Sequence, residues 1–189
     1  PRNQSAMLPF VQGQVKVERV LLYDPASGRE NPYDAVLLTN SSGMTLDGGA
    51  ITVFEGDRYV GEALVETLKS GDGRPVSFAM DLGTRVTTAF DSKQDQVYAV
   101  KVRRGIITTN SKNVEVRTYT IRSTDGKPKT LIVEHPVRPG WKLSGGFKPE
   151  ETTARHYRFR VALPAQPAGG GAKLAVSEEF EISSTIALT

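Results

Sequence analysis

The sequence predicts an all-β protein, an antiparallel β-sandwich of the immunoglobulin-like kind, and three observations carry that prediction. About ten strand-like runs are separated by clusters of turn residues, a pattern typical of antiparallel sheets joined by short turns. No window repeats its apolar residues with the 3.6-residue period of an amphipathic helix. The length of 189 residues suits either one such domain or two packed sub-sandwiches.

The composition is that of a folded chain, since 38% of the residues are hydrophobic and 24% are charged. No apolar run approaches the roughly 20 residues that a membrane-spanning helix needs, so we expect no membrane insertion by this segment. The absence of cysteine excludes disulfides, thiolate nucleophiles and zinc–thiolate sites. The sequence begins at Pro1, which predicts a processed protein or a piece of a longer one.

The first half of the chain contains the clearest hairpin signal. Residues 1–13 predict an irregular lead-in and residues 14–189 the β-sandwich domain, with a sub-boundary near 91–96 as an alternative. Ala50–Glu55 and Arg58–Glu66 flank Gly56-Asp57, and a Gly-Asp pair tolerates the positive φ values that a two-residue turn needs. We therefore expect these two runs to pair antiparallel.

Later runs alternate apolar and polar residues, as half-buried strands do. Residues 85–90 and 96–109 continue the β character, with a bend expected at Gly105. Glu178 interrupts the apolar side of the last run, which predicts that this strand frays or reaches the rim there. The residues predicted to be mostly buried are Phe78, Met80, Tyr157, Phe159, Val161, Leu174 and Val176.

The segment from Asn113 to Leu163 contains both histidines and the only tryptophan. Glu134-His135, with His156 from a following strand, is the candidate for a metal or catalytic site. A metal needs ligands that converge on one point, but adjacent strand residues point to opposite faces. No nucleophile elbow, P-loop, dinucleotide fingerprint or H-E-x-x-H motif is present, so we predict no enzyme and assign no catalytic or metal residue.

A structural role for the same segment is the alternative that we favour. Pro136 cannot donate a ladder hydrogen bond and predicts a strand end, and Pro139-Gly140 suits a type II turn. Trp141 is then expected to plug one end of the core, and Trp141→Ala to cost more stability than His135→Ala. Glu134 is expected to pair with Arg138 or Arg158, or to accept hydrogen bonds from loop amides.

Ligand binding is a third interpretation. Trp141 and Tyr157, with Arg138 and Arg158, could form an aromatic and basic shelf for a sugar or an acidic peptide. Core packing is the more frequent role of aromatic residues at strand ends, and we expect no cofactor. The candidate binding residues are Glu134, His135, Arg138, Trp141, Tyr157 and Arg158.

The net charge of +3 conceals an asymmetry along the chain. Residues 95–163 carry 14 Lys or Arg and 6 Asp or Glu, a net charge of +8, whereas the remaining residues carry 10 and 15, a net charge of −5. Such a split is typical of a face for an acidic partner or of solvated strand faces, and we favour solvated faces. Nucleic-acid binding is not expected, because aromatic residues are 7% of the chain and the basic residues are scattered.

Six parts of the chain, taken in order, form one recognisable series: Leu38–Asn40, Ile51–Ala63, Val76–Asp81 with Arg85-Val86, Tyr119–Ile121, Val133–Pro136 and Tyr157–Phe159. Together these segments resemble a bacterial family catalogued as domain of unknown function 4139. The resemblance covers most of Val20–Glu179, and the order of the matching segments carries it. It implies a β-sandwich-rich region of longer, often exported bacterial proteins, without established catalytic residues.

We therefore expect a non-catalytic structural or protein-interaction module of a larger bacterial protein, located in the periplasm or secreted. Its expected partners are other domains of the same chain or an unidentified protein, for which an acidic surface would suit. The alternatives are a metal-dependent hydrolase-like domain centred on Glu134, His135 and His156, and, third, a carbohydrate-binding module.

Overall fold

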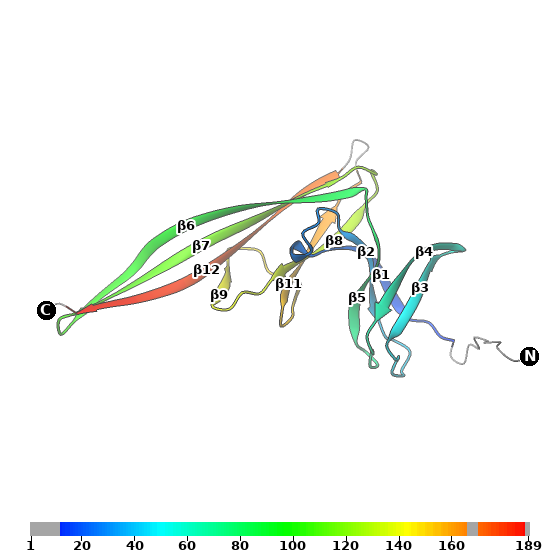
Figure 1. Ribbon diagram of the computed structural model, residues 1–189, viewed down its shortest axis with the longest axis horizontal. Coiled ribbons are helices and arrows are strands. Elements are labelled where there is room, and N and C mark those ends of the chain that lie inside the picture. Colours follow the sequence, from blue (N-terminus) through cyan, green and yellow to red (C-terminus); the bar gives the residue numbers. More distant parts are fainter. Residues whose placement is uncertain (1–11, 166–169, 188–189) are drawn as a thin grey trace, which may run out of the picture. The chain divides into compact units, whose positions relative to one another are not determined.

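The computed structural model describes residues 12–165 and 170–187, and strands account for most of them (Figure 1). The all-β prediction is confirmed. A short 3-10 helix, η1 (Pro25–Ser27), follows the first strand. The strands are β1 (Lys16–Tyr23), β2 (Tyr33–Thr39), β3 (Gly49–Glu55), β4 (Arg58–Val65), β5 (Gly73–Met80), β6 (Thr84–Arg103), β7 (Ile106–Ser123), β8 (Lys129–Pro136), β9 (Trp141–Ser144), β10 (Glu151–Thr152), β11 (His156–Leu163) and β12 (Gly170–Ala187).

The chain divides into two compact units. The first contains the residues up to Arg19 together with Ala35–Ala79, and the second contains Val20–Asp34 and the residues from Met80 onward. The predicted sub-boundary at 91–96 lies within β6, where the pairing with β7 shifts between Lys93 and Gln96.

The first unit contains the predicted hairpin. β3 and β4 pair antiparallel, and Glu55 lies opposite Arg58 across the turn. Gly56 has a φ of 61°, whereas Asp57 keeps a negative φ, so only the first turn position uses the freedom of glycine. The predicted hairpin is confirmed. β3 begins one residue earlier than predicted, and β4 ends one residue earlier.

A buried asparagine organises the loop after β2 in the same unit. The side-chain amide of Asn40 donates to the carbonyl oxygens of Met44 and Leu68, at 2.7 and 2.9 Å. Its carbonyl oxygen accepts from the backbone and the hydroxyl of Ser42, at 3.1 and 2.6 Å. Asn40 is fully buried, so these bonds satisfy a polar group that would otherwise be costly to remove from water.

The second unit is a sandwich of two sheets. One sheet contains β10, β11, β8 and the end of β1 in that order, and the other contains β6, β7, β12 and β9. β11 pairs antiparallel with β8, whereas Leu21–Tyr23 of β1 pairs parallel with Leu131–Val133. The buried core draws on both sheets: Leu21, Tyr23, Leu131, Val133, Phe159 and Leu163 from the first, and Val86, Tyr119, Ile121, Leu174 and Val176 from the second.

The predicted core is confirmed in its centre. Phe159, Leu174 and Val176 are buried, and Tyr157 and Val161 pack half-buried against them. Phe78 and Met80 were also expected to be mostly buried, but both are only half-buried. Alternation predicts the face that a side chain occupies, but the depth of burial depends on what covers that face.

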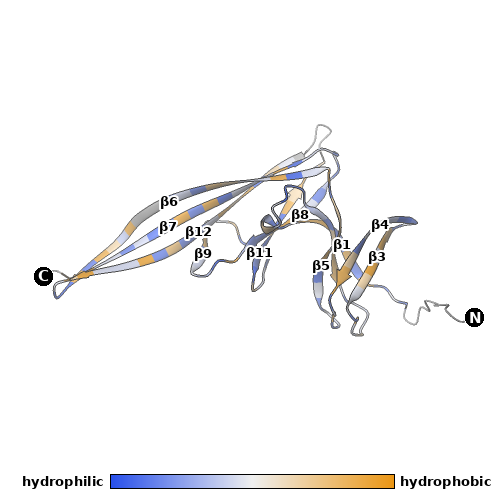
Figure 2. Cartoon of the chain, viewed as in Figure 1, coloured by the Kyte–Doolittle hydropathy of each residue, from blue (hydrophilic) through white to orange (hydrophobic). Residues whose placement is uncertain are grey.

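The three longest strands of the molecule lie side by side in one sheet, and they continue beyond the core (Figure 1). β6 and β7 form one long hairpin, which the sequence indicated only as separate runs with a bend. Arg104 and Gly105 connect them with φ values of 50° and 73°, and positive φ at both central residues is the feature of a type I′ turn. Hydrophobic and hydrophilic residues alternate along these strands (Figure 2).

Candidate functional site

Glu134 and His135 are adjacent on β8 and project to opposite faces of their sheet, as predicted. His135 points into the sandwich and is fully buried, and Glu134 is 8% exposed on the other face. Tyr157 lies opposite His135 and Arg158 lies opposite Glu134 on β11. Directly opposed residues share a face of the sheet. His135 therefore has Tyr157 as its neighbour, whereas Glu134 has Arg158.

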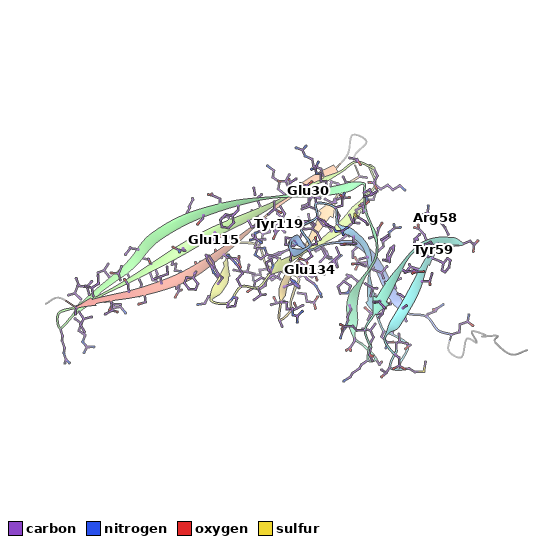
Figure 3. The ribbon with its side chains drawn as sticks, viewed as in Figure 1. Glu30, Arg58, Tyr59, Glu115, Tyr119 and Glu134 are labelled. Carbon is purple, nitrogen blue, oxygen red and sulfur yellow. The ribbon has the colours of Figure 1, made fainter. Side chains whose placement is uncertain are left out.

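His135 is held between the two sheets by hydrogen bonding and by aromatic packing. Tyr119 lies on β7 (Figure 3). Its hydroxyl oxygen is 2.7 Å from Nδ1 of His135. Burial raises the pKa of Tyr119 to about 12, so this hydroxyl keeps its hydrogen and shares a hydrogen bond with Nδ1. The rings of Tyr119, Phe159 and Tyr157 surround the imidazole at centroid distances of 6.0, 6.4 and 6.5 Å.

The other imidazole nitrogen faces a buried carboxylate. Nε2 of His135 lies 3.1 Å from Oε2 of Glu178, on β12, and both side chains are almost completely excluded from water. By hydrogen-bond geometry, Nε2 of His135 and Oε1 of Glu178 have no partner among the described residues. The contact between the imidazole and the carboxylate is therefore described as electrostatic.

Arg138 completes the network from the turn after β8. Its Nε and Nη2 donate to Oε2 of Glu178 at 3.0 and 2.5 Å, and its Nη1 donates to Oε2 of Glu115 at 2.6 Å. Burial by itself would raise the pKa of Glu178, but the contacts with His135 and Arg138 outweigh it and lower that pKa. Glu178 therefore carries its negative charge inside the protein.

We call His135, Tyr119, Glu178, Arg138 and Glu115 the buried polar network. It contains residues of β7, β8, β12 and the turn after β8, so it connects the two sheets of the sandwich. Sequence analysis singled out His135 and Arg138 and missed the other three. It also expected the last strand to fray or to reach the rim at Glu178, and both alternatives were wrong. β12 continues through this residue, which is buried, because Arg138 and His135 compensate its charge.

Glu134 belongs to a separate ion-pair group on the other face. Its Oε1 accepts a hydrogen bond from Nε of Arg158 at 2.9 Å, and Arg158 also donates from Nη1 to Glu151 at 2.8 Å. Burial alone would lower the pKa of Arg158, but the bonds with Glu151 and Glu134 raise it. Arg158 is one of the two arginine partners that the sequence predicts for Glu134.

The three proposed metal ligands do not converge. His156 lies opposite Pro136, which places it on the face of Glu134 and away from His135. In the part of the chain that the structure describes, no group of three or more His, Asp or Glu residues could hold a metal ion. The hydrolase alternative depended on that convergence.

Trp141 lies at the start of β9, not in the core. The type II turn is confirmed, since the N–H of Trp141 donates to the carbonyl oxygen of Arg138 at 3.2 Å and Gly140 has a φ of 80°. The expectation that Trp141 plugs the core was wrong: the indole is half-buried and pairs with β12 at Phe180. The guanidinium of Arg138 lies 4.0 Å from the centre of its ring, and the ring of Phe180 lies 5.5 Å away.

The proposed aromatic and basic shelf is likewise divided. Tyr157 stacks against His135 on the core side, at an interplanar angle of 27°, while Arg158 is engaged on the opposite face. Arg138 and Trp141 contact each other instead of forming an open surface. The four residues therefore do not share one face.

A comparison with protein-family models found no matching family, and comparisons with curated proteins and with solved structures found no significant match. No helix among the described residues is long and apolar enough to cross a membrane.

Proposed function

We propose that this chain is a non-catalytic structural or protein-interaction module of a larger, exported bacterial protein. The observation that supports the proposal is the engagement of the candidate residues with one another. His135 and Arg138 are bound within the buried polar network, and Glu134 and Arg158 are bound to each other. Side chains that are held in this way connect neighbouring strands and the two sheets.

The network suits a structural role because of its position between the sheets. A buried charge is costly unless it is paired, and removal of one partner leaves the other uncompensated. His135 from one sheet contacts Tyr119 and Glu178 from the other, so only one relative placement of the two sheets satisfies all three. We infer that the network specifies how the sheets pack, and that the sandwich is immunoglobulin-like.

The partners in this proposal are other domains of the same longer chain or a separate protein, outside the cytoplasm. The basic excess of residues 95–163 would complement an acidic surface. The three residues of the hydrolase alternative do not converge, and the four residues of the carbohydrate-binding alternative do not share one face.

Thermal unfolding with and without a chelator tests the structural role. We expect the melting temperature of the wild type to be unchanged by chelation. His135→Ala should lower it with or without chelator, and the control His156→Ala should change it little, because His156 lies outside the network. A fall on chelation that disappears in His135→Ala would replace this proposal with the metal-site alternative.

A further inference from the structure

The end of the β6–β7 hairpin, with the last residues of β12, exposes apolar side chains beyond the sandwich core. Val102 on β6 and Ile186 on β12 are 66% and 61% exposed, and Ile106 at the start of β7 is 45% exposed. The pairings Val102–Ile107–Ile186 and Arg103–Ile106–Ala187 place these residues together at one end of the sheet. We call residues 97–111 and 182–187 the hairpin end.

The apolar residues of the hairpin end lie on both faces of the sheet. Val102, Ile107 and Ile186 are directly opposed to one another and share one face, whereas Ile106 is the next residue along β7 and lies on the other. A partner that packs on a sheet would cover a single apolar face. Apolar residues on both faces instead favour insertion of the hairpin end itself into an apolar layer.

The charge of the hairpin end is positive and uncompensated. It contains Lys101, Arg103 and Arg104 and no Asp or Glu. None of the ion pairs between described residues involves these three side chains. Lys112, one residue outside the hairpin end, is different, because its Nζ lies 3.1 Å from Glu179 and 3.9 Å from Glu181.

Cations next to exposed apolar side chains match the two layers of an anionic lipid surface. The cations complement the phosphate headgroups, and the apolar side chains enter the boundary between headgroups and acyl chains. A second copy of this chain would bring the same uncompensated cations together, which opposes self-association through this end.

We propose that the hairpin end binds an anionic lipid surface, end-on, through Lys101, Arg103 and Arg104 and through the apolar side chains of Val102, Ile106 and Ile186. The contact is peripheral and reversible. It does not depend on the buried polar network, so its failure and the failure of the structural proposal are distinguishable.

Vesicle co-sedimentation of the full chain tests the charge requirement. The probes are vesicles of phosphatidylcholine alone and of phosphatidylcholine with phosphatidylglycerol in equal parts. We expect binding to the anionic vesicles only, weakened by high salt. Lys101→Gln, Arg103→Gln and Arg104→Asn together should weaken that binding on the order of a hundredfold, since each cation near an anionic surface contributes roughly a factor of five. Asn is chosen at Arg104 because it tolerates the positive φ there.

The matched control removes three other exposed cations, with Lys142→Gln, Lys148→Gln and Arg155→Gln. It changes the net charge equally and should bind anionic vesicles within about twofold of the wild type, because the affinity depends on where the charges lie. Equal loss in both triple variants, equal binding to both kinds of vesicle, or no binding at all would overturn the proposal.

Site-specific fluorescence tests the end-on geometry. The chain contains no cysteine, so Ile106→Cys introduces a single labelling site for a polarity-sensitive dye, and Phe147→Cys, at a residue 59% exposed, provides a control site. We expect a blue shift on addition of anionic vesicles at position 106 only. A dimer in sedimentation velocity that the triple variant abolishes, without a vesicle-induced blue shift, would assign the hairpin end to a second copy. Binding to polyglutamate without binding to vesicles would assign it to an acidic protein, and either result would overturn the lipid proposal.

Discussion

Nε2 of His135 lies 3.1 Å from Oε2 of Glu178, and this contact joins the two sheets of the sandwich where both side chains are buried. The carboxylate is kept charged in that position because Arg138 binds the same oxygen from the adjacent turn. The stability of the sandwich should therefore depend on the ionisation of Glu178.

The first prediction concerns acid stability. The pKa of Glu178 is lowered in the folded protein from its ordinary value of 4.5, so its contribution to stability is present above that pH. That contribution is lost as the pH falls through the lowered pKa, because the folded state then binds the proton that the unfolded state already holds. Glu178→Gln should destabilise the protein at neutral pH, and its difference from the wild type should shrink at acidic pH.

Chemical denaturation at a series of pH values measures this difference. The matched control is Glu181→Gln, on the same strand, because Glu181 is exposed and lies 3.9 Å from Lys112. Its difference from the wild type should be small at every pH. A Glu178→Gln difference that does not change with pH would show that the charge of Glu178 contributes nothing to stability.

The second prediction reverses an order expected from the sequence. His135→Ala should cost more stability than Trp141→Ala. His135→Ala leaves the Tyr119 hydroxyl without its buried partner, removes one of the two partners of Glu178 and opens a cavity, at a cost of about 3–5 kcal/mol. Trp141→Ala removes a half-buried ring and its cation–π contact with Arg138, which is worth about 0.5–2 kcal/mol beyond the packing lost. The free energy of unfolding of the two variants decides the order.

The fold was predictable where neighbouring residues in the sequence determine it. Gly56-Asp57 and Pro139-Gly140 define their turns by backbone preference alone, and the structure has both turns. The long β6–β7 hairpin was not predictable in the same way. Arg104 adopts a positive φ that its residue type does not favour, and the register shifts near Lys93 break the alternation of apolar and polar residues along β6.

The candidate site was less predictable, because its members are distant in the sequence and meet through the packing of two sheets. The signal that could have found Glu178 was present: a carboxylate at a position whose neighbours on the same face, Val176 and Phe180, are apolar. Such a carboxylate lies either at the rim of the sheet or inside the core with a charged partner. The pattern of neighbouring residues in the sequence does not distinguish these two positions. The partner, Arg138, lies 40 residues away along the chain.

The third prediction concerns Asn40 in the first unit. Asn40→Asp replaces the amide nitrogen that donates to the carbonyl oxygens of Met44 and Leu68 with a carboxylate oxygen. Both carbonyl oxygens lose one hydrogen bond and a negative charge is buried beside them. The variant should lose at least about 1–3 kcal/mol of stability. The control Asn110→Asp, at a half-buried position on β7, should cost less. Hydrogen exchange measures the effect locally: the amide of Leu68, bonded to the carbonyl of Leu46, should exchange faster only in Asn40→Asp.

The fourth prediction uses two glycines that share a left-handed backbone but differ in their surroundings. Gly140 has a φ of 80° and Gly145 a φ of 92°, so alanine is strained at both, by roughly 1–2 kcal/mol. A Cβ on Gly140 would also lie 2.6 Å from Cε2 of Phe180, whereas a Cβ on Gly145 would meet Cβ of Ser177 at 3.7 Å, an ordinary contact. Gly140→Ala should therefore cost more stability than Gly145→Ala.

The excess cost of Gly140→Ala should depend on the ring of Phe180. In a Phe180→Leu background the difference between the two alanine variants should shrink, because the atom that the new Cβ meets is gone. Trp141 is the only tryptophan and its ring lies 5.5 Å from that of Phe180, so its fluorescence should change in Gly140→Ala and stay unchanged in Gly145→Ala. Equal stability of the two alanine variants, with unchanged fluorescence in both, would mean that Phe180 moves aside freely and that the turn is not packed against β12.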